Sequence, residues 1–129
     1  MDLTNLPIIY IPEIKEEHII DYGNVSNDFN PLHFDKKAAE QAGFPSIIAH
    51  GMMTMGISTK LISPWLSNDY FISEYESSFH KPLLVGDSLH LVAELIKQQE
   101  TYARISFKGV NQDRKTIITG KILVKSNLT

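Results

Sequence analysis

The second half of the chain alternates apolar and polar residues with a period of two, and this alternation constrains the fold more than any other feature. Successive side chains of a strand point to opposite faces, so such runs are typical of half-buried β-strands. Short polar links separate the runs, at residues 85–87, 97–101 and 111–115. Strands joined by short links pair antiparallel. The sets predicted to share one face of their strand are Phe71, Tyr75 and Phe79; Leu89, Leu91, Ala93 and Leu95; Ala103, Ile105 and Phe107; and Ile118, Ile122 and Val124.

The first half of the chain predicts two short helices separated by a structured loop. Residues 14–22 have amphipathic spacing, and Gly23 is expected to stop that helix. Residues 26–35 are rich in turn formers, and Pro31 excludes the preceding residue from the helical region. Asp35 is expected to cap a second helix over residues 36–42, which ends before Gly43.

A third helix is expected within residues 44–65, where Pro64 ends it. Its apolar residues surround the helix instead of forming one stripe, which predicts a fully buried helix. One buried helix against an antiparallel sheet gives an α+β domain. The residues that carry this expectation are Met52, Met53, Met55, Ile57, Leu61 and Ile62.

Size and composition exclude several classes of protein. The 129 residues show no repeat or linker and predict a single domain over residues 1–129. A net charge of −3 without a basic stripe argues against nucleic acid as the main partner. The absence of cysteine excludes disulfides and a thiol nucleophile. Neither a signal peptide nor a membrane span is recognisable, which predicts a soluble, cytoplasmic protein.

A dense polar cluster in the loop offers the first candidate chemistry. Asp28 and His33 lie five residues apart with Pro31 between them, so only a fixed loop can bring them together. A carboxylate beside an imidazole supplies the two groups that proton transfer needs. The alternative is purely structural, with Asp28 and Asn30 forming Asx turns and His33 bonded to a main-chain carbonyl. A metal site made by His33, Asp28, Asp35 and His50 is a third interpretation, although their spacing matches no metal signature.

His50 and Gly51 open the predicted buried helix and offer a second candidate site. Main-chain amides at a helix N-terminus have no helical partner and lie at the positive end of the helix dipole. A glycine there leaves room for a ligand, so the Gly51 amide suits a reaction that builds negative charge on a carbonyl oxygen. Close helix–sheet packing is an equally good reason for this glycine. His18, His80 and His90 have no partner motif and are expected on helix or strand surfaces.

Three segments resemble the MaoC-like (R)-specific enoyl-thioester hydratases and dehydratases, with the same order and gaps from about residue 5 to 125. They are YGNVSNDFNPLHFD (residues 22–35), AGFPSIIAHGMMTMG (residues 42–56) and FHKPLLVGDSL (residues 79–89). The catalytic subunit of the mycobacterial-type heterodimeric (3R)-hydroxyacyl-carrier-protein dehydratase is similar in IAHGMMTMG, in Trp65 and in residues 74–79. Many members have glycine where this chain has Asn27, a residue type that tolerates left-handed backbone.

The resemblance implies a hotdog fold, in which an antiparallel sheet wraps one long central helix. It also implies reversible dehydration of a (3R)-hydroxyacyl thioester, linked to acyl carrier protein or coenzyme A, without metal or redox cofactor. Asp28 and His33 would be the catalytic pair and Gly51 the thioester-binding amide, supported by Ser26, Asn30 and His50. The expected assembly is a homodimer or a heterodimer with a second hotdog subunit.

Two rival functions remain open at the level of sequence. The first is a non-catalytic hotdog subunit that binds acyl chains and shapes the substrate tunnel of a partner. The presence of both Asp28 and His33 argues against it, since a silent subunit need not keep them. The second is a metal-dependent hydrolase, which elemental analysis and chelation would identify.

Overall fold

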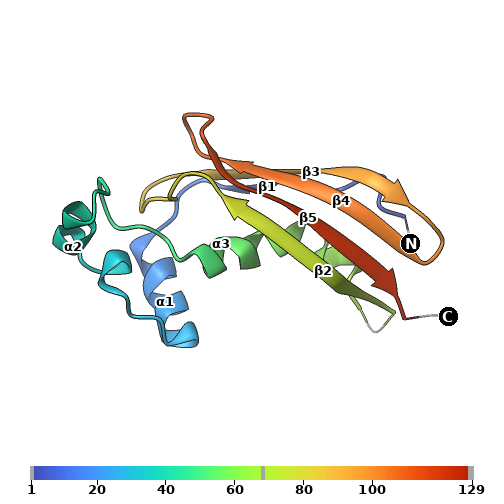
Figure 1. Cartoon of the computed structure of the whole chain (residues 1–129), viewed down its shortest axis with the longest axis horizontal. Coiled ribbons are helices and arrows are strands. Elements are labelled where there is room, and N and C mark those ends of the chain that lie inside the picture. The colour runs from blue at the N-terminus through green and yellow to red at the C-terminus, as the bar shows by residue number, and fades with distance from the viewer. Residues whose placement is uncertain (1, 68, 128–129) are drawn as a thin grey trace.

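The computed structural model describes residues 2–67 and 69–127, and within them five antiparallel strands form one sheet (Figure 1). The strand order across the sheet is β1-β3-β4-β5-β2. This arrangement confirms the expected antiparallel sheet. The strands are β1 (Ile9–Ile11), β2 (Tyr70–Phe79), β3 (Leu89–Gln98), β4 (Tyr102–Val110) and β5 (Thr116–Ser126).

One face of the sheet carries most of the hydrophobic core. On β3, β4 and β5 the alternation predicted from the sequence is confirmed, because each set of apolar residues turns to this face. Removing such side chains from water is the main favourable contribution to folding. The buried members are Leu89, Leu91, Ala103, Ile105, Phe107, Ile118, Ile122 and Val124.

On β2 the predicted shared face is confirmed for Tyr75 and Phe79, which pair with the buried Ile122 and Ile118, but it is wrong for Phe71. The pairing of β2 with β5 shifts between Ile72 and Glu74, so one extra residue interrupts the strand. A β-bulge of this kind moves the residues before it to the opposite face. Phe71 therefore lies across from Lys125 and is 41% exposed, while Tyr75 pairs with the buried Ile122 on the core face.

The central helix lies under the sheet but is shorter and more exposed than predicted (Figure 1). Helix α3 spans Gly51–Ser58 and tightens into a 3₁₀ turn over Thr59–Leu61. The Ser58 and Thr59 hydroxyls donate to main-chain carbonyls within the preceding turn, which competes with the regular ladder. Met53 and Ser58 are buried, but Met52 is 64% exposed. The prediction of a helix buried on all sides is therefore wrong for the single chain.

Two further helices lie at one end of the molecule, below the sheet (Figure 1). Helix α2 (Lys36–Gln41) confirms its prediction, since the Asp35 side chain accepts a hydrogen bond from the Lys37 amide. Helix α1 (Glu16–Ser26) runs through Gly23, so the predicted stop there is wrong. Gly23 is instead a point of close approach, because a Cβ at this residue would lie 2.5 Å from Cζ of Phe34. In the described residues, no helix is long and apolar enough to cross a membrane.

Candidate active site

The loop after α1 is built from side chains that accept hydrogen bonds from main-chain amides two residues ahead. Asp28 Oδ1 accepts from the Asn30 amide at 3.2 Å, and Asn30 Oδ1 accepts from the Leu32 amide at 3.2 Å. Ser26 Oγ accepts from the Asp28 amide at 3.3 Å. Asn27 adopts the left-handed conformation with φ of 59°, as its side chain permits. The Asx turns expected of a purely structural loop are therefore present, and they fix where Asp28 points.

The His33 ring is held by a hydrogen bond that also sets its tautomer. Nδ1 lies 2.7 Å from the main-chain oxygen of Ile48. A carbonyl only accepts, so Nδ1 carries the proton and the neutral ring keeps its lone pair on Nε2. The Ile48 amide in turn donates to the Leu32 carbonyl at 3.2 Å. The loop is thus tied to the segment that precedes α3, and Nε2 is left for other partners.

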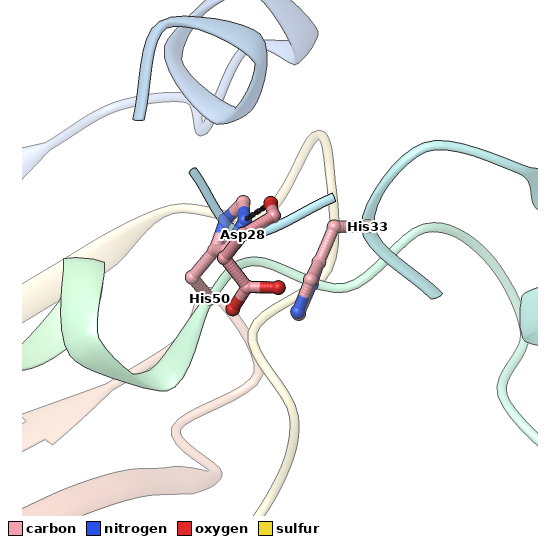
Figure 2. Close-up of side chains that lie close together, drawn as sticks. All are labelled: Asp28, His33 and His50. Atoms are coloured by element: carbon pink, nitrogen blue, oxygen red, sulfur yellow. Dashed lines mark hydrogen bonds between the residues drawn. The ribbon is translucent and has the colours of Figure 1, made fainter. Parts of the chain in front are cut away.

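Asp28 and His33 come together as the sequence predicted, and His50 joins them (Figure 2). Ligand atoms of the three side chains lie within 4.8 Å of one another. Figure 2 shows the Asp28 carboxylate beside the nitrogen-bearing tip of His33. Asp28 is exposed and His33 partly exposed, so a ligand can reach both. An imidazole lone pair next to a carboxylate is suited to moving a proton.

His50 forms the inner wall of this cluster. Its ring stacks on the His33 ring, with centroids 3.9 Å apart and planes 22° apart. The side chain is 1% exposed and its Nε2 lies 3.1 Å from the main-chain oxygen of Asp28. The sequence indicated His50 as the start of the buried helix and as a ligand of the alternative metal site, and the family resemblance gave it a supporting role. No local sequence pattern predicts the stacking of His50 on His33, because it depends on a tertiary contact between the loop and the start of α3.

The stacked rings do not suit the proposed metal site. A metal ion bound by imidazole lies close to the plane of the ring, along the nitrogen lone pair. The planes of the His33 and His50 rings are almost parallel, so the lone pairs that lie in these planes do not converge on one metal ion. Asp35 is not part of the group either, since its carboxylate caps α2.

Gly51 is the first residue of α3 and shares a pocket with His33. The pocket has a volume of about 280 Å³, and Phe79 forms part of its wall. A Cβ on Gly51 would lie 3.2 Å from Cζ of Phe79, so a larger residue would narrow this space. The amide belongs to the first turn, where no helical carbonyl accepts from it. The residue that carries this donor and the acid–base group of His33 therefore line one pocket.

The remaining histidines are exposed, as expected, and lie outside the Asp28–His33–His50 cluster, although His80 lines the same pocket as Gly51. His18 Nδ1 accepts from the Lys15 amide at the start of α1. His80 contacts the Thr119 hydroxyl at 2.8 Å, and His90 is exposed on β3 next to the Tyr10 ring.

Comparison with protein families identifies the chain. The family model described as "MaoC like domain" matches residues 7–117. This chain belongs to the MaoC-like family. The resemblance drawn from three sequence segments is thereby confirmed.

Relatives within the family carry names of hydratases and dehydratases. The mitochondrial 3-hydroxyacyl-[acyl-carrier-protein] dehydratase of Arabidopsis thaliana is 34% identical over 87 residues, which cover 67% of this chain and 52% of that protein. The chain thus matches about half the length of this plant relative. The (R)-specific enoyl-CoA hydratase of Aeromonas caviae is 29% identical over 107 residues, or 81% of this chain and 80% of that protein.

Solved structures confirm the hotdog fold. The (R)-hydratase from A. caviae involved in PHA biosynthesis superposes with a TM-score of 0.85 at 23% identity, covering 97% of this chain and 96% of that one. The C-terminally truncated HadBC (3R-hydroxyacyl-ACP dehydratase) complex of Mycobacterium tuberculosis gives a TM-score of 0.75 at 15% identity, covering 94% and 98%. At these identities the likeness concerns the fold alone.

Proposed function

We propose that the chain catalyses the reversible removal of water from a (3R)-hydroxyacyl thioester to give the trans-2-enoyl thioester. One observation carries the proposal: His33 and Gly51 line one pocket, and a carboxylate oxygen of Asp28 lies within 4.8 Å of a His33 nitrogen. The reaction needs an acid–base group at C2 and C3 and a donor at the thioester oxygen. The names of the plant and A. caviae relatives support the same chemistry.

Each of the three residues has a role that follows from its contacts. His33 Nε2 accepts the C2 proton, because Nδ1 is committed to the Ile48 carbonyl. The electron pair of the C2–H bond then delocalises onto the thioester oxygen, where the Gly51 amide stabilises the negative charge. The enolate electrons then form the C2–C3 double bond while the C3–O bond breaks, and the dyad of Asp28 and His33 gives a proton to the departing hydroxyl, which leaves as water. One proton is taken and one returned, so the dyad ends in its starting protonation state.

His33 lines the pocket and the Asp28 carboxylate lies within 4.8 Å of it, so one compact dyad handles both protons, which favours syn elimination. The proton at C2 and the hydroxyl at C3 then leave from the face of the substrate that meets Asp28 and His33. Ser26 and Asn30 serve as supports, because their side chains hold the turns on either side of Asp28. The scheme uses no metal or redox cofactor.

The proposal extends to the wider setting of the protein. It treats residues 1–129 as a single MaoC-like hotdog domain in the cytoplasm, acting on acyl groups carried by acyl carrier protein or coenzyme A. It includes a dimer, either with a second copy or with another hotdog subunit. The outer edge of β2 supports this assembly, since β2 pairs only with β5 among the described residues and unpaired strand edges favour further pairing.

Hydration of crotonyl-CoA by the purified chain tests the activity, and two variants test the dyad. Asp28→Asn keeps an oxygen for the Asn30 amide but removes the carboxylate. His33→Asn keeps a donor for the Ile48 carbonyl but removes Nε2. Because general acid–base catalysis contributes at least ~10²-fold, each variant should lower turnover by at least that factor while the chain stays folded.

His90→Asn provides the matched control, since His90 is exposed on β3 away from the cluster. It should leave turnover unchanged. Near wild-type rates in both dyad variants would contradict the catalytic assignment. No turnover of either carrier form by the wild type, alone or with candidate hotdog partners, would instead favour the non-catalytic subunit.

A further inference from the structure

His50 has one nitrogen that is satisfied and one that is not. Nε2 lies 3.1 Å from the main-chain oxygen of Asp28, and since a carbonyl only accepts, Nε2 carries the hydrogen. Nδ1 has no hydrogen-bond partner and is the only such buried side-chain nitrogen or oxygen among the described residues. The side chain is 1% exposed.

An unpartnered buried nitrogen is unfavourable, so packing alone does not explain a histidine here. The rings of Tyr22 and Phe34 lie against His50, with centroids 4.8 and 5.8 Å away. Such surroundings suit a phenylalanine at least as well. What a phenylalanine cannot supply is the Nε2–H donor to Asp28.

His50 also connects the two halves of the site. Its main chain begins α3, so the next amide is that of Gly51. Its side chain reaches across 22 residues of sequence to the Asp28 carbonyl, and its ring supports the face of His33. Asp28 is exposed in a loop, and this bond ties its main chain to the start of α3. One side chain therefore relates the position of the acid–base pair to that of the thioester-binding amide.

We propose that His50 is a positioning residue, whose Nε2–H aligns the Asp28 carboxylate and the His33 ring with the Gly51 amide. This role rests on the proposed dehydratase function. Because it acts through Asp28 and His33, it affects the rate of proton transfer more than the affinity for substrate. A small misplacement of catalytic groups is enough to lower a rate by tenfold to a hundredfold.

Two substitutions separate the donor from the ring. His50→Phe keeps an aromatic ring to stack on His33 but removes the donor. His50→Gln places an amide N–H close to the position of Nε2 but removes the ring. With crotonyl-CoA as substrate, His50→Phe should lower kcat by about tenfold or more. Its KM should change little and its Tm should not fall, since the unpartnered nitrogen is gone. His50→Gln should recover most of the lost kcat.

The outcomes against the proposal are distinct. Unchanged kcat in His50→Phe, or an equal loss in His50→Gln and His50→Phe, would overturn the positioning role while leaving the dehydratase function standing. A wild type inactive on every enoyl thioester tried would overturn the proposed function and this role with it. Nitrogen-15 NMR of the wild type gives a readout that needs no turnover: a hydrogen on Nδ1 of His50, and none on Nε2, would also overturn the role.

Discussion

Because Gly51 has no side chain, it leaves room for a thioester in the proposed pocket. A Cβ there would lie 3.2 Å from Phe79 Cζ, whereas a Cβ on Gly56, five residues later in α3, would meet nothing within 4 Å. Replacing either glycine by valine makes the same change within one helix. The two variants therefore differ mainly in whether the added methyl groups fill the pocket.

Gly51→Val should lower kcat/KM for crotonyl-CoA by tenfold or more, because branched carbon then occupies the space beside the amide. Gly56→Val should keep its activity. The Tm of the two variants should be similar, since the Phe79 ring is half exposed and can move away. Steady-state kinetics and thermal denaturation of both variants test this. Normal turnover by Gly51→Val would mean that the carbonyl binds elsewhere.

Sequence patterns identified the residues of the site that a single loop brings together. Asp28 and His33 are five residues apart, and the Asx turns and proline between them are local devices that sequence reveals. His50 differs because it meets His33 through the pairing of Leu32 with Ile48, a contact between two segments. No spacing rule relates such residues, so the contacts that define the role of His50, its stack on His33 and its bond to Asp28, come from the structure.

At the scale of elements, the strands with unbroken alternation were predictable and the irregular elements were not. No sequence pattern predicts the bulge after Ile72 in β2, although this bulge moves Phe71 to the opposite face of the sheet from Tyr75. Strand β1 was missed because only three residues form it, between Pro7 and Pro12. Its partner strand β3 lies about eighty residues later in the chain, so no local pattern predicts that the two strands pair.

Gly23 is the clearest case of a tertiary contact mistaken for a local signal. It lies inside α1, and its hydrogen faces the Phe34 ring, which in turn packs edge-on against His50. Alanine at this position would force the ring toward the site. Overpacking of this kind costs about 1–3 kcal/mol.

Gly23→Ala should therefore be less stable than Gly56→Ala by about 1–3 kcal/mol in urea denaturation. Comparing two glycines within helices cancels the gain in helix propensity, which favours alanine by about 1 kcal/mol in both. Adding Phe34→Leu should relieve part of the loss, because leucine lacks the far end of the ring. Equal stability of the two alanine variants would show that the ring accommodates the methyl group without cost.

For the whole molecule, the single chain leaves large apolar side chains exposed at the start of α3 and at the end of β2. Met52 beside Gly51 is 64% exposed, and Phe79 across the pocket is 52% exposed. Phe79 also ends β2, whose outer edge has no strand partner among the described residues. Exposed apolar groups next to an open strand edge are typical of a surface that another subunit covers.

The proposed dimer should appear in light scattering as twice the 14.6 kDa mass of the chain, or as a complex with another hotdog subunit after co-expression. Met52→Glu should weaken this assembly, because a buried interface would have to desolvate the new charge. Ile96→Glu is the matched control: Ile96 is 54% exposed but lies on β3, separated from the β2 edge by β4 and β5. It should assemble like the wild type. A fully active monomer at micromolar concentration would contradict both the homodimer and the heterodimer, and equal masses for the two glutamate variants would place the interface away from Met52.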